Sequence, residues 1–153
     1  MASVLVRPVS VDDFEALVEI DEVYAEAYGL EPVMTRSSLN FYARSAHSFA
    51  SLESNKPSGF VFAQSVWNGT RPTVQIYRLA VNDVTNQTNG ISSREALFEA
   101  VIKSAYDAAV YDLQMIHHDA DERTTAILKR LYKKVPASVY TLTLGSRGGG
   151  ELG

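Results

Sequence analysis

The sequence contains no cysteine, and this absence excludes several chemistries at once. Without a thiol the protein has no disulfide, no cysteine nucleophile and no sulfur-ligated metal site. Long apolar runs are missing as well. Residues 1–10 hold only a short apolar stretch, too short for a membrane span or a secretion signal. We therefore expect a cytoplasmic protein that does not enter a membrane.

Concentrated charge of one sign is also missing. The 153 residues carry a net charge of -4, and both signs are mixed along the chain. Because nucleic-acid binding depends on clustered lysine and arginine, this pattern predicts no nucleic-acid partner. The chain has the balance of a soluble globular protein, with 46% hydrophobic and 21% charged residues, and its length suits one domain.

The hydrophobic pattern changes period several times along the chain, which predicts alternating strands and helices. The expected strands are residues 3–7, 47–53, 59–67, 73–81, 112–117 and 138–144, and the expected helices are residues 11–28, 35–44, 92–109 and 121–134. This order predicts an α+β fold, with a mixed, mostly antiparallel twisted sheet of about six strands and helices on both faces. We expect one domain over residues 1–144 and a flexible glycine-rich tail over residues 145–153.

The most specific motif lies between the fourth expected strand and the third expected helix. It reads Gln87-Thr88-Asn89-Gly90-Ile91-Ser92. Together with the element order, it resembles the GNAT (Gcn5-related N-acetyltransferase) superfamily, whose members carry Q/R-x-x-G-x-G/A at this place. Ser92 departs from that pattern. Within the superfamily the chain is similar to a small, functionally uncharacterised group of GNAT-like proteins, as the runs 59–67 and 101–111 indicate.

The resemblance implies acetyl-CoA as co-substrate. A helix N-terminus binds anions through its unpaired N–H groups and its partial positive charge, so the loop would hold the pyrophosphate. The pantetheine arm would pair with the end of the fourth strand. The coenzyme-binding residues implied in this way are Leu79, Val81, Gln87, Asn89, Gly90, Ile91, Ser92, Ser93 and Arg94.

A purely structural interpretation of the same loop remains open. Residues 92–95 have the S-x-x-E form of a capping box, in which Glu95 would reach back to the N–H of Ser92. Such a cap uses the N–H groups that a phosphate would need. The loop is therefore either a phosphate cradle or a well-capped helix start.

Tyr132 is the first candidate for catalysis. By the resemblance, it stands where superfamily members place a tyrosine that protonates the leaving thiolate. The chain departs from the family pattern on both sides. Thr125 replaces an expected asparagine, and residues 135–137 replace a glycine-phenylalanine pair. The structural alternative is a tyrosine that packs its ring on the sheet.

His117 is the second candidate, because it ends the fifth expected strand, beside the cleft that the resemblance implies. A neutral imidazole there accepts a proton from the attacking amine. The alternative is a solvated or capping histidine beside Asp119 and Asp121. Since His117 and His118 are adjacent on a strand, they point to opposite faces, and we expect no metal site.

Two functional hypotheses follow. The first is an acyl-CoA-dependent N-acetyltransferase that transfers its acyl group directly to an unidentified small-molecule or peptide amine. The second is a catalytically inactive GNAT-fold module for binding or assembly, in which a sheet edge pairs with a second copy to give a homodimer.

Overall fold

The computed structural model describes residues 4–82 and 87–145, with the side chains of residues 87–92 outside the description. Its sheet has five strands: β1 (Val4–Pro8), β2 (Phe49–Glu53), β3 (Lys56–Trp67), β4 (Pro72–Val81) and β5 (Leu113–Met115). Its helices are η1 (Val11–Asp13), α1 (Phe14–Tyr28), α2 (Arg36–Tyr42), α3 (Gln87–Asp107) and α4 (Glu122–Leu131). None of the described helices combines the length and apolar character needed to cross a membrane.

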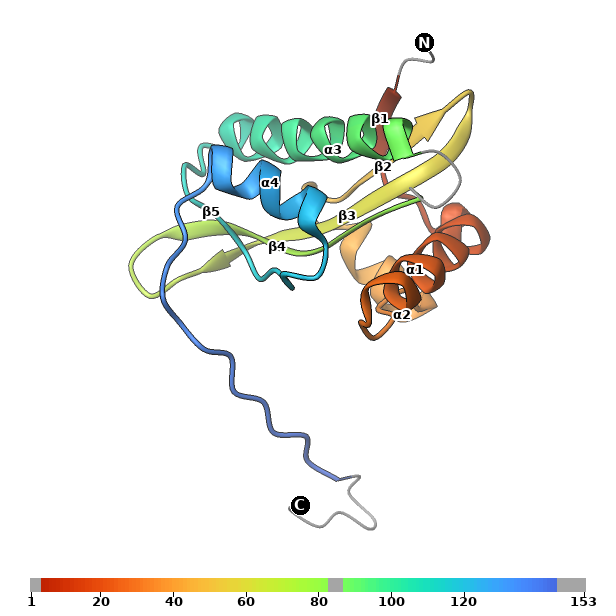
Figure 1. Ribbon diagram of the computed structural model, residues 1–153. Helices are drawn as coiled ribbons and strands as arrows, with labels where there is room; N and C mark the ends of the chain where they lie inside the picture. Colours follow the sequence, from red (N-terminus) through yellow and green to blue (C-terminus); the bar gives the residue numbers. More distant parts are fainter. Residues whose placement is uncertain (1–3, 83–86, 146–153) are drawn as a thin grey trace.

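The strands follow one another across the sheet in chain order, β1-β2-β3-β4-β5. The first four are antiparallel to their neighbours, and β5 runs parallel to β4. Helices α3 and α4 cover one face, while α1 and α2 cover the other (Figure 1). The predicted α+β architecture, a mixed and mostly antiparallel sheet between helices, is therefore confirmed.

Alternation along β3 builds the core on both faces of the sheet. Val61 and Ala63 pack under α3, whereas Phe60 and Phe62 pack against α1 and α2. All four side chains are fully buried. Because successive residues of a strand point to opposite faces, the four consecutive apolar residues 60–63 supply two clusters at once.

The start of the first helical region agrees with the sequence. Ser10 and Asp13 form a capping box immediately before the predicted helix of residues 11–28. The carboxylate of Asp13 also pairs with the guanidinium of Arg7 at 2.7 Å. Gly29 ends α1 with a left-handed φ of 68°, a conformation that glycine adopts without a steric cost.

The start of α3 differs from the expectation. The helix begins at Gln87, so its backbone runs through Gly90 and Ser92. Ser92 is therefore not the N-cap, and the predicted capping box is wrong. A single glycine costs a helix only about 1 kcal/mol relative to alanine, which is too little to keep this polar stretch out of the helix.

The predicted last strand is also wrong. Residues 138–144 form neither strand nor helix, and residues 133–145 are largely exposed. Figure 1 shows this segment leaving the body of the domain beyond α4. A strand needs a neighbour to pair its backbone groups, and the segment has none within the described chain. The glycine-rich residues 146–153 lie outside the described residues.

Candidate functional site

A bulge in β4 opens the sheet. Phe62 pairs with Arg78 and Ala63 with Ile76, so Tyr77 is an extra residue between the two pairs. Such a bulge bends its strand and disturbs the ladder. Pairing between β4 and β5 ends at Ile76, and the two strands diverge from that point.

Beyond the bulge, the main-chain groups of Leu79 and Val81 form the free edge of β4. Asn82 donates its N–H to the carbonyl of Ser58 on the β3 side at 2.8 Å. Main-chain groups alternate in direction along a strand, so Leu79 and Val81 direct theirs to the other side, where β5 has ended. Within residues 4–82 and 87–145, no hydrogen bond from these groups to another segment is recorded on that side.

A narrow cleft lies between the diverging strands. Its lining comes from α1, the following loop, β4 and the residues at and after the end of β5: Tyr24, Leu30, Tyr77, Arg78, Leu79, Met115, Ile116, His117 and His118. Its volume is about 10 Å³, which is room for about one water molecule. The structure thus brings Leu79 and His117, two of the predicted site residues, into one cleft.

His117 is oriented by Thr125. Its Nε2 lies 2.7 Å from the hydroxyl of Thr125, and that hydroxyl donates to the main-chain carbonyl of Asp121 at 3.0 Å. The hydroxyl therefore accepts from Nε2–H of a neutral ring, and Nδ1 is left to take up a proton. Burial lowers the pKa of His117, although the charges of Asp121 and Asp119 oppose this effect.

A buried charged cluster lies behind the cleft, centred on Asp121 at the N-cap of α4. Asp121 accepts hydrogen bonds from the Tyr24 hydroxyl, from the Arg94 guanidinium at 3.0 and 3.1 Å and from the Thr124 hydroxyl at 2.6 Å. Burial alone raises the pKa of Asp121. The hydrogen bonds of Thr124 and Tyr24 and the charge of Arg94 more than offset it, so the pKa lies below the ordinary value. Burial, then the charge of Asp121, raises the pKa of Tyr24.

Arg94 therefore does not stand where a phosphate contact requires it. Its side chain is fully buried and pairs with Asp121, which corrects the expectation that it faces a ligand. Ser93 is also fully buried, and it bonds to Ser58 and Glu53 at 2.9 Å each. No local pattern signals these contacts, because the partners lie 27 to 40 residues away in the sequence.

The earlier start of α3 changes which N–H groups are available for an anion. Only the first four N–H groups of a helix lack an acceptor inside it. In a helix that begins at Gln87, these include the groups of Gln87 and Asn89. The N–H groups of Gly90, Ile91 and Ser92 have acceptors within the helix.

Tyr132 lies outside the cleft. Helix α4 ends at Leu131, and Tyr132 continues in an extended conformation, with its ring centroid 5.9 Å from that of Phe98. Its hydroxyl oxygen is buried and has no hydrogen-bond partner among the described residues. Burial raises its pKa to about 12. The structure thus separates Tyr132 from His117, the other predicted catalytic residue.

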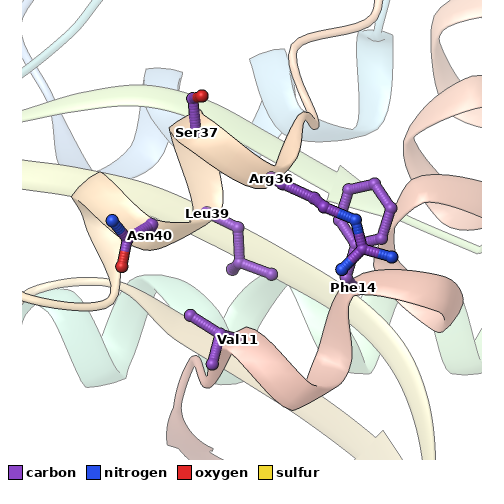
Figure 2. A pocket seen from close by; sticks show the side chains of 6 residues that line it. All are labelled: Val11, Phe14, Arg36, Ser37, Leu39 and Asn40. Atoms are coloured by element: carbon purple, nitrogen blue, oxygen red, sulfur yellow. The ribbon is translucent and has the colours of Figure 1, made fainter.

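A larger hollow of about 340 Å³ lies elsewhere, between the start of α1 and helix α2. Figure 2 shows Arg36 reaching over the ring of Phe14, 4.3 Å from its centroid, while Val11 and Leu39 face each other across the gap. Arg36 also pairs with Glu15 at the surface. Since no polar side chain of its lining is buried, we favour the smaller cleft as the candidate site.

Sequence reasoning missed Tyr24, Asp121 and Thr125 as members of this site. Tyr24 belongs to the apolar face of α1, and this position indicates only that its side chain packs in the core. Asp121 stands directly before Glu122, a place typical of an N-cap, and this local signal could have identified its structural role. Thr125 departs from the family motif, and nothing in its neighbourhood in the sequence signals its contact with His117.

Comparisons with known proteins agree with this architecture. The model of the family described as Protein of unknown function (DUF1999) matches residues 29–147. The wild-type protein TTHA1254 from Thermus thermophilus is 30% identical, with a TM-score of 0.72 over 94% of this chain and 99% of that chain. No curated protein matches the chain.

Two acetyltransferases share the fold at low identity. A ribosomal-protein-alanine N-acetyltransferase from Brucella melitensis biovar Abortus 2308 has a TM-score of 0.71 at 14% identity, over 94% of this chain and 100% of that chain. Aminoglycoside N-acetyltransferase AAC(6')-Iy in complex with CoA has a TM-score of 0.71 at 11% identity, over 94% of this chain and 96% of that chain.

Proposed function

The chain belongs to the DUF1999 family of proteins of unknown function and has the fold of GNAT acetyltransferases, and from this premise we propose that it is an acyl-CoA-dependent N-acetyltransferase. It would use acetyl-CoA and act by direct transfer on an unidentified small-molecule or peptide amine. The observation that carries the proposal is the open main-chain edge of β4 at Leu79 and Val81, beside the cleft that holds His117.

The edge suits the coenzyme because the pantetheine arm carries amides. An extended amide chain pairs with an open strand edge as an added strand does. The main-chain N–H of Val81 would polarise the acyl carbonyl. The first N–H groups of α3, including those of Gln87 and Asn89, would face the pyrophosphate. Arg94 has no direct contact in this proposal, because Asp121 already holds it inside the protein.

His117 would serve as the base. Its ring is neutral at pH 7 because burial lowers its pKa, and the hydroxyl of Thr125 fixes Nε2 as the protonated nitrogen. Nδ1 then accepts the proton of the attacking amine. Thr125 is a positioning residue, since it acts through the histidine.

The cleft must widen before a coenzyme enters. Its volume of about 10 Å³ holds a water molecule but not a pantetheine arm. The short β5 is the wall most suited to move, because it pairs with β4 over only three residues. Binding would therefore displace the segment of His117 and His118 from β4.

Titration with acetyl-CoA tests the coenzyme step directly. We expect binding heat in calorimetry and a rise in Tm, because a ligand that binds only the folded state stabilises it. No heat and no rise in Tm at millimolar acetyl-CoA would remove the proposal.

Turnover, measured as thiol release with a panel of amines, tests the base. His117→Asn should lower turnover about 10²- to 10⁴-fold while acetyl-CoA still binds. Thr125→Val should lower turnover and shift its pH profile, and Thr125→Ser, which keeps the hydroxyl, should restore both. If all three variants turned over acetyl-CoA as fast as the native chain, His117 would not be the base.

A second candidate function is a binding or assembly module without catalysis. The narrow cleft and the enclosed Arg94 favour it, because both leave less for a coenzyme to bind. Turnover of acetyl-CoA with any amine would exclude it, whereas an unchanged Tm at millimolar acetyl-CoA would support it.

A further inference from the structure

The segment of residues 138–144 exposes most of its apolar side chains. Val139, Tyr140, Leu142 and Leu144 are 68%, 92%, 69% and 64% exposed. Single exposed apolar residues are ordinary on a protein surface. Four within seven consecutive residues are more than scattered exposure, and concentrated exposed apolar side chains mark an interaction site.

The order of these residues suits a strand. Tyr140, Leu142 and Leu144 alternate with Thr141 and Thr143, so an extended backbone places the three large residues on one face and the two threonines on the other. Threonine, tyrosine and valine are also enriched in strands. The segment therefore carries the pattern of a half-buried strand but has no neighbouring strand.

The sheet offers an unpaired edge at β5. Val74 of β4 donates its N–H to the carbonyl of Asp112 at 2.9 Å, and Ile116 donates to the carbonyl of Ile76 at 3.4 Å. Asp112 and Ile116 thus face β4, and the alternating residues Leu113 and Met115 direct their N–H and C=O groups outward. In the described part of the chain nothing pairs with this edge, because β5 is the last strand of the sheet.

The side chains around this edge are apolar as well. Leu113 and Met115 pack at the margin of the core under α3 and α4. Tyr111, Ile116 and Leu131, which lie before β5, after it and at the end of α4, are 71%, 39% and 52% exposed. A strand added here would extend the core with its apolar face and leave its threonines beside the exposed Gln114.

We propose that residues 138–144 of one copy pair with the β5 edge of a second copy, and that the exchange is reciprocal. The result is a dimer with two-fold symmetry, in which the same edge and the same segment are used on both sides. The sheet of each copy then has six strands. This inference concerns assembly and does not depend on the proposed acyl transfer.

The path of the chain favours a second copy over its own domain. Tyr132 leaves α4 with an extended backbone, φ -121° and ψ 155°, and no turn follows in residues 132–145. Pro136 keeps the residue before it extended. Figure 1 shows the segment running away from the sheet. A strand that returned to its own β5 edge would need a reversal here.

Cysteine cross-linking tests which chain supplies the strand. The native chain has no cysteine, so Gln114→Cys on β5 and Thr141→Cys on the segment introduce unique thiols. The two single variants are unfolded together, refolded and treated with a short bismaleimide. We expect a covalent dimer whose cross-linked peptides join residue 114 of one variant to residue 141 of the other.

Two results would overturn the proposal. One is a cross-link that forms only within a single chain, in the Gln114→Cys/Thr141→Cys double variant. The other is no cross-link between these positions in any mixture. The first result places the strand on its own sheet, and the second leaves the segment in solvent.

Light scattering gives an independent readout. The native chain should have twice its monomer mass of 16.8 kDa. Leu142→Asp, on the apolar face, should give monomers, while the matched Thr143→Asp, on the opposite face, should remain dimeric. A monomeric native chain, or equal behaviour of both variants, would contradict the exchange. Circular dichroism of each variant shows that the domain itself is folded.

Discussion

Helix α4 joins two regions that depart from the usual distribution of side chains in opposite ways. At its start, Asp121 and Arg94 are charged and fully buried. Beyond its end, Tyr140 and Leu142 are apolar and exposed. The charges find their partners within one chain, whereas the apolar residues find none among the described residues. The first region is thus complete in a single copy, and the second is incomplete until another surface covers it.

The buried cluster is not explained by stability alone. Replacing a buried ion pair by apolar residues of similar volume is often neutral or stabilising, because removing the charges from water is costly. The cluster does hold Asp121 in place, and Asp121 holds the first turn of α4, including Thr125. Through Thr125 it orients His117. The charges therefore serve the geometry of the candidate site.

The largest expected effect comes from breaking the buried pair on one side only. Arg94→Met leaves Asp121 buried without its counter-charge, which should lower the free energy of unfolding by about 3–5 kcal/mol. Urea unfolding measures the loss. Lys103→Met is the matched control, because its partner Asp107 lies on the surface, and such a pair contributes about 1 kcal/mol or less. Similar losses in both variants would contradict the role of the cluster.

The next largest expected effect concerns the exposed residues 138–144, and it is a dependence of Tm on protein concentration. If two copies exchange residues 138–144, unfolding includes dissociation, so Tm rises with protein concentration. A tenfold increase should stabilise the dimer by about 1.4 kcal/mol. Leu142→Asp should remove this dependence. A Tm of the native chain that is constant over a hundredfold range would place the segment in solvent in every copy.

The strongest local patterns predicted much of the fold. The runs 59–67 and 73–81 are rich in β-branched and aromatic residues, and only residues 68–72 separate them. The hairpin of β3 and β4 could therefore be predicted from neighbouring residues alone. The first helical region, predicted over residues 11–28, begins and ends at local caps, Ser10 and Gly29. These features depend on contacts within a few residues, which a sequence displays directly.

The errors arose where distant partners decide the structure. Residues 138–144 have a strand pattern, but a strand forms only where another edge pairs with it. Tyr24 and Asp121 lie 97 residues apart in the sequence, and no local signal connects them. At the candidate site, Leu79 and His117 share one cleft because both stand near strand ends, and strand ends are visible in a sequence. The burial of Arg94 depends on the packing of α3 against α4.

Acid should destabilise the native chain by a smaller amount. Burial lowers the pKa of His117 and His47 below the ordinary value of 6.5, so the unfolded chain binds protons more readily than the folded one. Stability is complete above pH 6.5 and is lost as pH falls through the lowered native values. Asp121, whose pKa is also lowered, loses its contribution only at lower pH, below about 4.

Thermal unfolding between about pH 7.5 and 4.5, at about 0.15 M salt, measures this dependence. His117→Asn and His47→Asn should each flatten the curve of Tm against pH, because each removes one group that gains a proton on unfolding. A curve unchanged by both variants would contradict the assignment.

The smallest expected effect belongs to Tyr132, the residue between the two regions. Its hydroxyl is buried and has no hydrogen-bond partner in the described chain. Removing a polar atom whose desolvation is uncompensated is neutral or stabilising, so Tyr132→Phe should raise the free energy of unfolding by about 1 kcal/mol or less. The catalytic role that the family resemblance implies predicts a different result. If Tyr132 protonates a leaving thiolate, Tyr132→Phe lowers acetyl-CoA turnover about 10²-fold or more, with stability unchanged. Measuring unfolding and turnover on this one variant therefore decides whether its hydroxyl belongs to the core or to the chemistry.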